Sequence, residues 1–190
     1  MDSKEIKDLG MILSIITNGF FNAQEIVPKL KRLETDCVMV GLDGSSAKSQ
    51  DKIRGVKGSF KKAIAFIRAA KQAEITTSFI TTVHALNFNE LSKIRDLAIH
   101  EEVNWQIQEA TPIGRFPKKL LLSEEEYYAL GLFIRSTQKN YATKNLTIIG
   151  THNFGFHSNV IPNLSSYPTW NGCYAGKTVL GIQSNGNIKR

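Results

Sequence analysis

Cysteine is scarce in this sequence, and its scarcity limits the kinds of site that the chain can build. Two cysteines, Cys37 and Cys173, occur among 190 residues, and they lie far apart. A disulfide framework needs several paired cysteines, and a structural zinc ion or an iron–sulfur cluster usually takes about four protein ligands. Two distant thiols therefore exclude both a disulfide-stabilised fold and a complete cysteine-based metal site.

The sequence also lacks long apolar runs and clustered positive charge. No stretch reaches the ~18 consecutive apolar residues of a membrane-spanning helix, and residues 1–10 are too polar for a signal peptide. We therefore expect a cytoplasmic protein. The net charge is +7, but the basic residues are spread along predicted helices without interleaved aromatic residues. This favours solvated helix faces over a nucleic-acid surface, although an anionic substrate or peptide could use the charge.

Four segments repeat one pattern: a short apolar run, a polar turn, and an amphipathic stretch with helical spacing. The runs begin about 25 to 40 residues apart, the length of a strand–helix–strand crossover. They are mostly apolar on both faces, which is typical of parallel strands buried beneath helices. The pattern predicts an α/β fold, either an open doubly wound sheet or a barrel. The predicted strands are residues 11–16, 37–42, 75–83 and 103–107.

Capping signals mark the starts of the predicted helices. Ser123 followed by Glu126 forms a capping box, in which the two side chains satisfy free backbone N–H groups at a helix start. Pro28 fits badly inside the first helix, so we expect a kink or a later start there. The other predicted cap residues are Asn22, Ser59 and Asn89, and residues 3–9 are interpreted as the end of a further helix.

The pattern changes after about residue 140. The tail is rich in Asn, Gly, Ser and Thr, its helical periodicity is lost, and residues 178–186 predict a β-hairpin. We therefore divide the chain into residues 1–140 and 141–190.

Polar residues follow the end of every predicted strand. Ligands of parallel α/β folds bind at the carboxyl ends of the strands. A single Asn-Gly or Asp-Gly pair more often only turns the chain, whereas four polar ends at one edge favour a shared ligand site. The four segments are residues 17–19, 41–44, 81–84 and 106–109.

Taken in order, these segments resemble the radical S-adenosylmethionine (radical SAM) enzymes with a C-terminal SPASM domain. The resemblance covers about residues 9–189 and implies a partial parallel (β/α) barrel of the radical SAM type. Residues 1–140 would hold its last four strand–helix units, and residues 141–190 a linker and the start of the SPASM-like extension. The most specific match in the barrel is residues 41–44 with 51–55 and 58–60. The tail adds an independent match at residues 170–176, 180–182 and 185–186.

The resemblance implies that the full-length enzyme uses S-adenosylmethionine and a 4Fe–4S cluster to modify a peptide or protein. Arg54 would pair with the carboxylate of the cofactor, and the alternative is an exposed loop cation. Gly41 stands where the family often has a serine that contacts the cofactor. Cys173 matches an auxiliary-cluster ligand, whereas Cys37 is expected to be a small core residue. The residues that match cofactor-binding positions are Thr17, Asn18, Gly41, Asp43, Arg54, Thr82 and Gln108.

Two of these assignments have a structural alternative. Asp43 would either hydrogen-bond a backbone turn or lie near the ribose, and the turn role is favoured. Gln106 and Gln108 share a strand face, where one could reach the adenosine or both could satisfy buried backbone groups.

The cysteine triplet that defines the family is absent from this sequence. Those thiolates lie together in one loop, so two distant cysteines cannot replace them. We therefore expect a chain that is truncated at both ends relative to the family, is inactive alone and binds no cofactor by itself. Its first strand would then be an exposed apolar edge. The alternatives are a non-catalytic module that binds a peptide or protein, and a complementing chain that supplies the missing barrel units.

Overall fold

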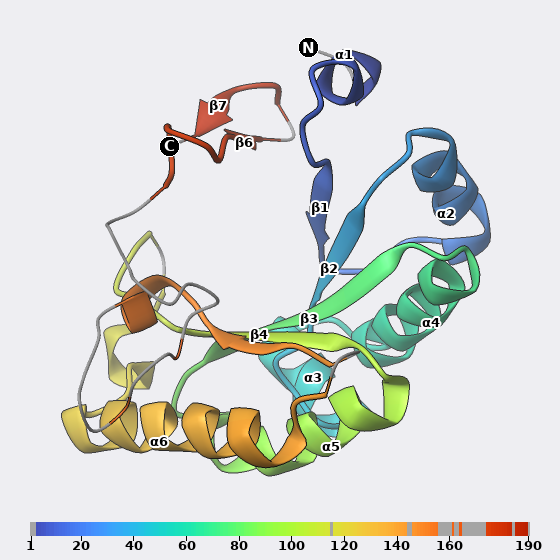
Figure 1. The fold of residues 1–190 in the computed structure, drawn as a ribbon. Coiled ribbons are helices and arrows are strands. Elements are labelled where there is room, and N and C mark those ends of the chain that lie inside the picture. Colours follow the sequence, from blue (N-terminus) through green and yellow to red (C-terminus); the bar gives the residue numbers. More distant parts are fainter. Residues whose placement is uncertain are drawn as a thin grey trace.

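The computed structural model describes residues 3–114, 116–143, 146–155, 161, 164, 174–183 and 185–189. Its main feature is a five-stranded parallel sheet in which strand order follows the sequence (Figure 1). The strands are β1 (Ser14–Thr17), β2 (Cys37–Gly41), β3 (Thr76–Val83), β4 (Asn104–Glu109) and β5 (Ile148–Gly150).

The positions of the helices show that the fold is a partial barrel and not an open doubly wound sheet. Helices α2, α4, α5 and α6 lie against the same face of the sheet (Figure 1), and the strand order never reverses. A doubly wound sheet instead has a reversal in strand order and helices on both faces. The helices are α1 (Ser3–Asp8), α2 (Ala23–Arg32), α3 (Ala47–Arg54), α4 (Ser59–Gln72), α5 (Leu91–Glu101) and α6 (Glu124–Tyr141), with short 3₁₀ turns η1 (Phe88–Glu90), η2 (Lys118–Leu120) and η3 (His152–Gly155).

The hydrophobic core lies between the sheet and this helical layer. Val38 and Val40 of β2 alternate with residues on the opposite face, and both are fully buried in the core. Phe79 and Ile107 occupy equivalent buried positions on β3 and β4. Strand alternation therefore sends one set of side chains into the core and the other to the helix-free face.

Several predicted local features are confirmed. Ser123 and Glu126 form the predicted capping box of α6, and α1 lies where the end of a helix was expected. Asn22 caps α2, which runs from Ala23 to Arg32 with Pro28 inside it, so the later start considered for this helix is wrong. In the tail, β6 (Gly181–Ile182) pairs antiparallel with β7 (Ile188–Lys189), which is the predicted hairpin.

Two elements were not predicted. β5 follows the predicted boundary at residue 140 and pairs in parallel with β4, so the sheet extends to Gly150. Helix α3 occupies a segment interpreted as a loop. Its C-terminal cap Gly55 has φ of +65°, and Asp51 then accepts hydrogen bonds from Gly58 N and Phe60 N, which begins α4 directly afterwards.

The first strand is an apolar edge, as predicted. Within the part of the chain that the structure describes, β1 pairs with β2 alone, and its Ile16 side chain is 68% exposed. The C-terminal hairpin lies beside this edge, because Val179, Leu180 and the β1 segment line the same cavity of about 680 Å³. None of the described helices is long and apolar enough to cross a membrane.

Candidate functional site

The carboxyl ends of β2, β3 and β4 bring polar side chains together on the helix-free face of the sheet. Gly41, Ile80 and Gln106 are register partners across these strands, and Thr82 pairs with Gln108 one step further along. Gln108 Nε2 donates a 2.9 Å hydrogen bond to Thr82 Oγ1. Because Gln106 and Gln108 are two residues apart on one strand, both lie on this face.

Asp43 is the centre of this edge. One carboxylate oxygen accepts a 2.9 Å hydrogen bond from Thr82 N, and the other lies 2.7 Å from Arg54 Nη2. The Asp43 side chain is 8% exposed and that of Arg54 is 34% exposed. Burial raises the pKa of Asp43 above its usual value, while the Arg54 guanidinium and the Thr82 N–H oppose this shift. Asp43 thus has a structural role between β3 and α3, although its partners are not the backbone turn expected from the sequence, and part of the Arg54 side chain stays exposed.

The absence of a side chain at Gly41 makes room for Arg54. A Cβ atom at position 41 would lie 2.5 Å from Arg54 Nη2, which is closer than real Cβ contacts allow. The guanidinium therefore occupies the space where a serine would stand. The sequence identified both residues but not this dependence, because they come from different elements and are 13 positions apart.

Gln50 holds the loop after β2 and was missed from the sequence. It is 1% exposed, and its Oε1 accepts hydrogen bonds from Asp43 N at 2.7 Å and Gly44 N at 2.8 Å. Its Nε2 donates to Gly41 O at 3.2 Å. These bonds connect α3 to the end of β2 and so position Arg54, which is the last residue of α3, over Asp43.

Asn87 and His84 complete the wall after β3. Asn87 is fully buried and donates from Nδ2 to Asp43 O at 2.9 Å and to Thr82 O at 3.0 Å. His84 Nδ1 accepts a hydrogen bond from Leu86 N. Burial lowers the pKa of His84, which favours the neutral ring, although the nearby Asp43 charge acts in the opposite sense.

Asp43, Thr82 and His84 line one side of a cavity of about 500 Å³. The ring of Phe116 contacts the His84 ring with 5.8 Å between centroids, and it lines the cavity together with Arg54 and Thr82. The cavity therefore combines a partly exposed guanidinium, polar strand-end groups and an aromatic face. Such a set suits a ligand with an anionic group and a flat ring.

The predicted residues at the end of β1 are used in a local turn. Thr17 Oγ1 accepts a hydrogen bond from Gly19 N at 3.1 Å, and Asn18 Oδ1 accepts one from Phe20 N at 3.0 Å. Gly19 has φ of +67°, which glycine adopts without the penalty of a side chain. A cofactor contact of Thr17 or Asn18 stays a prediction.

The residues of this chain do not fit a family-type iron–sulfur cluster. Cys37 is the first residue of β2, about 13 Å along the strand from Gly41, and burial raises the pKa of its thiol. Cys173 lies outside the described residues. Within the described ranges, no group of three His, Cys, Asp or Glu residues could hold a metal ion. A cluster held by three cysteines would require ligands that the sequence does not contain.

Comparison with known proteins agrees with this fold. A family model described as the Radical SAM superfamily matches residues 2–98, just over half of the chain. The chain belongs to the radical SAM superfamily. Among curated relatives, it is 30% identical over 121 residues to the "AdoMet-dependent heme synthase" of Methanosarcina barkeri, covering 63% of this chain and 35% of that protein. It is 28% identical over 91 residues to the "PqqA peptide cyclase" of Rhizobium meliloti, covering 48% and 24%.

Solved structures show the same architecture over nearly the whole chain. The crystal structure of Streptococcus suis SuiB bound to S-adenosylmethionine aligns with a TM-score of 0.71 at 16% identity, covering 98% of this chain and 44% of SuiB. SuiB bound to its precursor peptide SuiA aligns with a TM-score of 0.69. This likeness establishes the radical SAM-like partial barrel. The chain spans about a third or less of the curated relatives and less than half of SuiB.

Proposed function

We propose that this chain forms the ligand-facing part of a radical SAM enzyme that modifies a peptide. The observation that carries the proposal is the Arg54 guanidinium, held by Asp43 at the carboxyl edge of the sheet with a third of its side chain exposed. Two proteins similar to this chain support a peptide substrate: one is named a peptide cyclase, and the other has a bound precursor peptide. A cytoplasmic location, inferred from the sequence, is part of the same proposal.

In this proposal Arg54 binds the carboxylate of S-adenosylmethionine. One Nη group is committed to Asp43, but the planar fork of a guanidinium has five N–H donors and can serve a second carboxylate. Thr82 and Gln108 lie on the same face and offer polar groups for the adenosine. The cavity beside them has room for a ring against Phe116. The assignment of Gly41 and Asp43 to the same site is part of the proposal.

The cluster must then be supplied by polypeptide other than the residues of this chain. The chain has two cysteines, neither of which can form the family triplet, so we propose that it is inactive alone. The open edge of β1 is the place where further barrel strands would pair, because among the described strands β1 neighbours β2 alone and its other side is available for backbone pairing. A complementing segment would carry three cysteines in one loop. The SPASM-like assignment of residues 141–190, with Cys173 as a cluster ligand, belongs to the same proposal.

Equilibrium dialysis with S-adenosylmethionine tests the Arg54 assignment, and it uses the chain assembled with the complementing segment that carries the cluster, because we expect the chain alone to bind no cofactor. A hydrogen bond to a charged group contributes about 1.5–3 kcal/mol, so Arg54→Gln should weaken binding about tenfold or more. Arg54→Lys keeps the ion pair with Asp43 but loses the fork, and should give an intermediate affinity. Arg95→Gln is the matched control, because Arg95 pairs with Asp96 on α5. Equal affinity for the wild type and a folded Arg54→Gln variant would contradict the proposal.

The second candidate is a non-catalytic module that binds a peptide. A groove lined by lysines beside the site favours it, and its geometry is described below. Peptide binding by the chain alone, with no affinity for S-adenosylmethionine even after assembly with the complementing segment, would favour this module over the enzyme fragment.

A further inference from the structure

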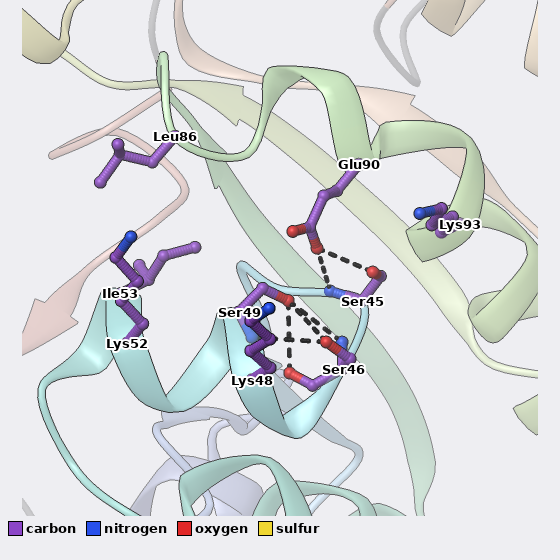
Figure 2. Close-up of a pocket in the computed structure, with 9 residues that line it drawn as sticks. All are labelled: Ser45, Ser46, Lys48, Ser49, Lys52, Ile53, Leu86, Glu90 and Lys93. Carbon is purple, nitrogen blue, oxygen red and sulfur yellow. Dashed lines mark hydrogen bonds between the residues drawn. The ribbon is translucent and has the colours of Figure 1, made fainter.

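A second cavity lies on the outer side of the candidate site, between α3 and the segment that leads into α5 (Figure 2). It has a volume of about 520 Å³ and is open to solvent. We call it the lysine groove. Its lining residues are Ser45, Ser46, Lys48, Ser49, Lys52, Ile53, Leu86, Glu90 and Lys93.

The charge of the lysine groove is positive. Lys48, Lys52 and Lys93 form no ion pair within 4 Å with any residue of the described ranges, whereas Lys7, Lys29, Lys31 and Lys71 all do. Figure 2 shows the lysine side chains on both walls, from α3 and from α5. Three lysines against one glutamate leave a net charge of about +2. The groove therefore presents the ammonium groups of Lys48 and Lys52 without an ion pair to any described residue, whereas the charge of Lys93 helps to lower the pKa of Glu90.

Glu90 is already committed within the groove. Its carboxylate accepts hydrogen bonds from Ser45 N at 2.9 Å and Ser45 Oγ at 2.7 Å (Figure 2). Burial alone would raise the pKa of Glu90, but hydrogen bonds from Ser45 and Ser49 outweigh it and the pKa is lowered. Ser46 caps α3 through Ser49, so the start of the helix is satisfied by its own side chains. The lysines, rather than the helix end, are the groups left for a ligand.

The small apolar area of the groove indicates which class of anionic ligand would fit it. Leu86 is 50% exposed and lies with Ile53 at the end of the groove towards the candidate site. No aromatic side chain lines the groove, and a flat macrocycle would need a broader apolar wall. A peptide with acidic residues and one aliphatic side chain matches this combination of charge and small apolar area.

The groove adjoins the candidate cofactor site. Ile53 and Leu86 line both this cavity and the one that contains Asp43, Arg54 and Thr82. We propose that the lysine groove binds an acidic segment of the peptide substrate and directs the neighbouring residues of that peptide towards the Arg54 cavity. This inference rests on the proposed function and adds the chemical class of the substrate segment and its place on the molecule.

Fluorescence anisotropy with labelled synthetic peptides of about 12 residues tests this inference. The probe peptide contains Asp, Glu and Leu, and its control replaces every Asp and Glu with Asn and Gln. The acidic peptide should bind at low salt at least tenfold more tightly than the control, and its affinity should fall as salt is added, because ammonium–carboxylate attraction is screened. The double variant Lys48→Glu/Lys52→Glu should lose at least tenfold in affinity. The matched double variant Lys61→Glu/Lys139→Glu, which changes net charge equally on exposed helix positions, should lose less than threefold.

Three outcomes would overturn the inference: equal losses for the two double variants, equal binding of the neutral peptide, or tighter binding of an oligonucleotide or of iron coproporphyrin than of the acidic peptide. The dialysis of Arg54 variants is independent of these lysines. If the assembled protein binds S-adenosylmethionine through Arg54 but the chain binds no acidic peptide, this inference is overturned and the proposed function stays in place.

Discussion

Replacement of Gly41 by alanine should separate Arg54 from Asp43. The new Cβ atom would lie 2.5 Å from Arg54 Nη2, so one of the two groups must move. Arg54 is the end of a flexible, partly exposed side chain, whereas Gly41 is fixed in β2 by pairing with β3. We therefore expect the guanidinium to move and the buried Asp43 carboxylate to lose its cation.

The size of the effect follows from the burial of the two partners. Removing one partner of a fully buried ion pair costs about 3–5 kcal/mol. Water screens this pair on the Arg54 side, where 34% of the side chain is exposed, and Asp43 keeps its hydrogen bond from Thr82 N. We therefore expect Gly41→Ala to lower the free energy of unfolding by about 1–3 kcal/mol, measured by urea denaturation followed by circular dichroism.

A double-mutant cycle shows whether Arg54 is the cause. In an Arg54→Ala background the space over position 41 is free, so Gly41→Ala should change stability by less than about 0.5 kcal/mol there. Gly131→Ala is the matched control: its Cβ would meet its nearest neighbour, a side-chain carbon, at 3.4 Å, and the change in a helix should be neutral or stabilising by up to ~1 kcal/mol. An equal cost of Gly41→Ala in both backgrounds would refute the reasoning.

Three further predictions concern other parts of the chain. Gln50→Ala should lower the free energy of unfolding by about 2–4 kcal/mol in a urea titration, because it leaves two buried N–H groups and one carbonyl without their partner. Replacement of the exposed Gln72 by alanine should change the same free energy by less than about 0.5 kcal/mol. The Arg68 guanidinium lowers the pKa of Glu101 below its usual 4.5, so this pair adds stability that is present above pH 4.5 and lost as the pH falls through the folded pKa. In urea titrations across pH 3–6, the stability of Glu101→Gln should therefore fall less with acid than that of the wild type. Equal acid sensitivity of the two proteins would contradict the assignment. Ile16→Lys should reduce concentration-dependent light scattering by placing a charge on the open apolar edge, and unchanged scattering would show that self-association uses another surface.

The strands and most helices were predictable because their signals are local. Buried parallel strands are apolar on both faces, which makes them recognisable in the sequence. The capping box formed by Ser123 and Glu126 predicts the first residue of α6. Helix α3 gave no such signal, because its single fully buried residue is Gln50 and it has no apolar stripe. It is held instead by the cap at Ser46 and by long-range hydrogen bonds to the end of β2.

β5 was missed for a similar reason. It has three residues in a stretch rich in Asn and Thr, which is too short for a periodic pattern. Its position depends on pairing with β4 and on Gln138 Nε2, which donates to Ile148 O at 2.9 Å. Contacts of this kind exist only after the chain has folded, so a local reading of the sequence cannot supply them.

The candidate site was predictable in its members but not in its geometry. Asp43 and Arg54 were both identified from their positions after β2, yet their contact requires α3 to turn the chain back over Gly41. The lysine groove was not predicted, because Lys48 and Lys52 of α3 line one cavity with Lys93 of α5 only once the chain has folded. In the sequence these lysines are indistinguishable from those on solvated helix faces.

The most direct test of the account is the iron and sulfide content of the chain after anaerobic reconstitution and desalting, together with its absorption spectrum. The account predicts no stoichiometric iron or sulfide and no brown chromophore, because two distant cysteines cannot provide the family ligand set. Co-expression with a polypeptide that carries three cysteines in one loop should be required before a cluster is retained. A stable, stoichiometric 4Fe–4S cluster on this chain alone would contradict the claim that it forms only the ligand-facing part of the barrel.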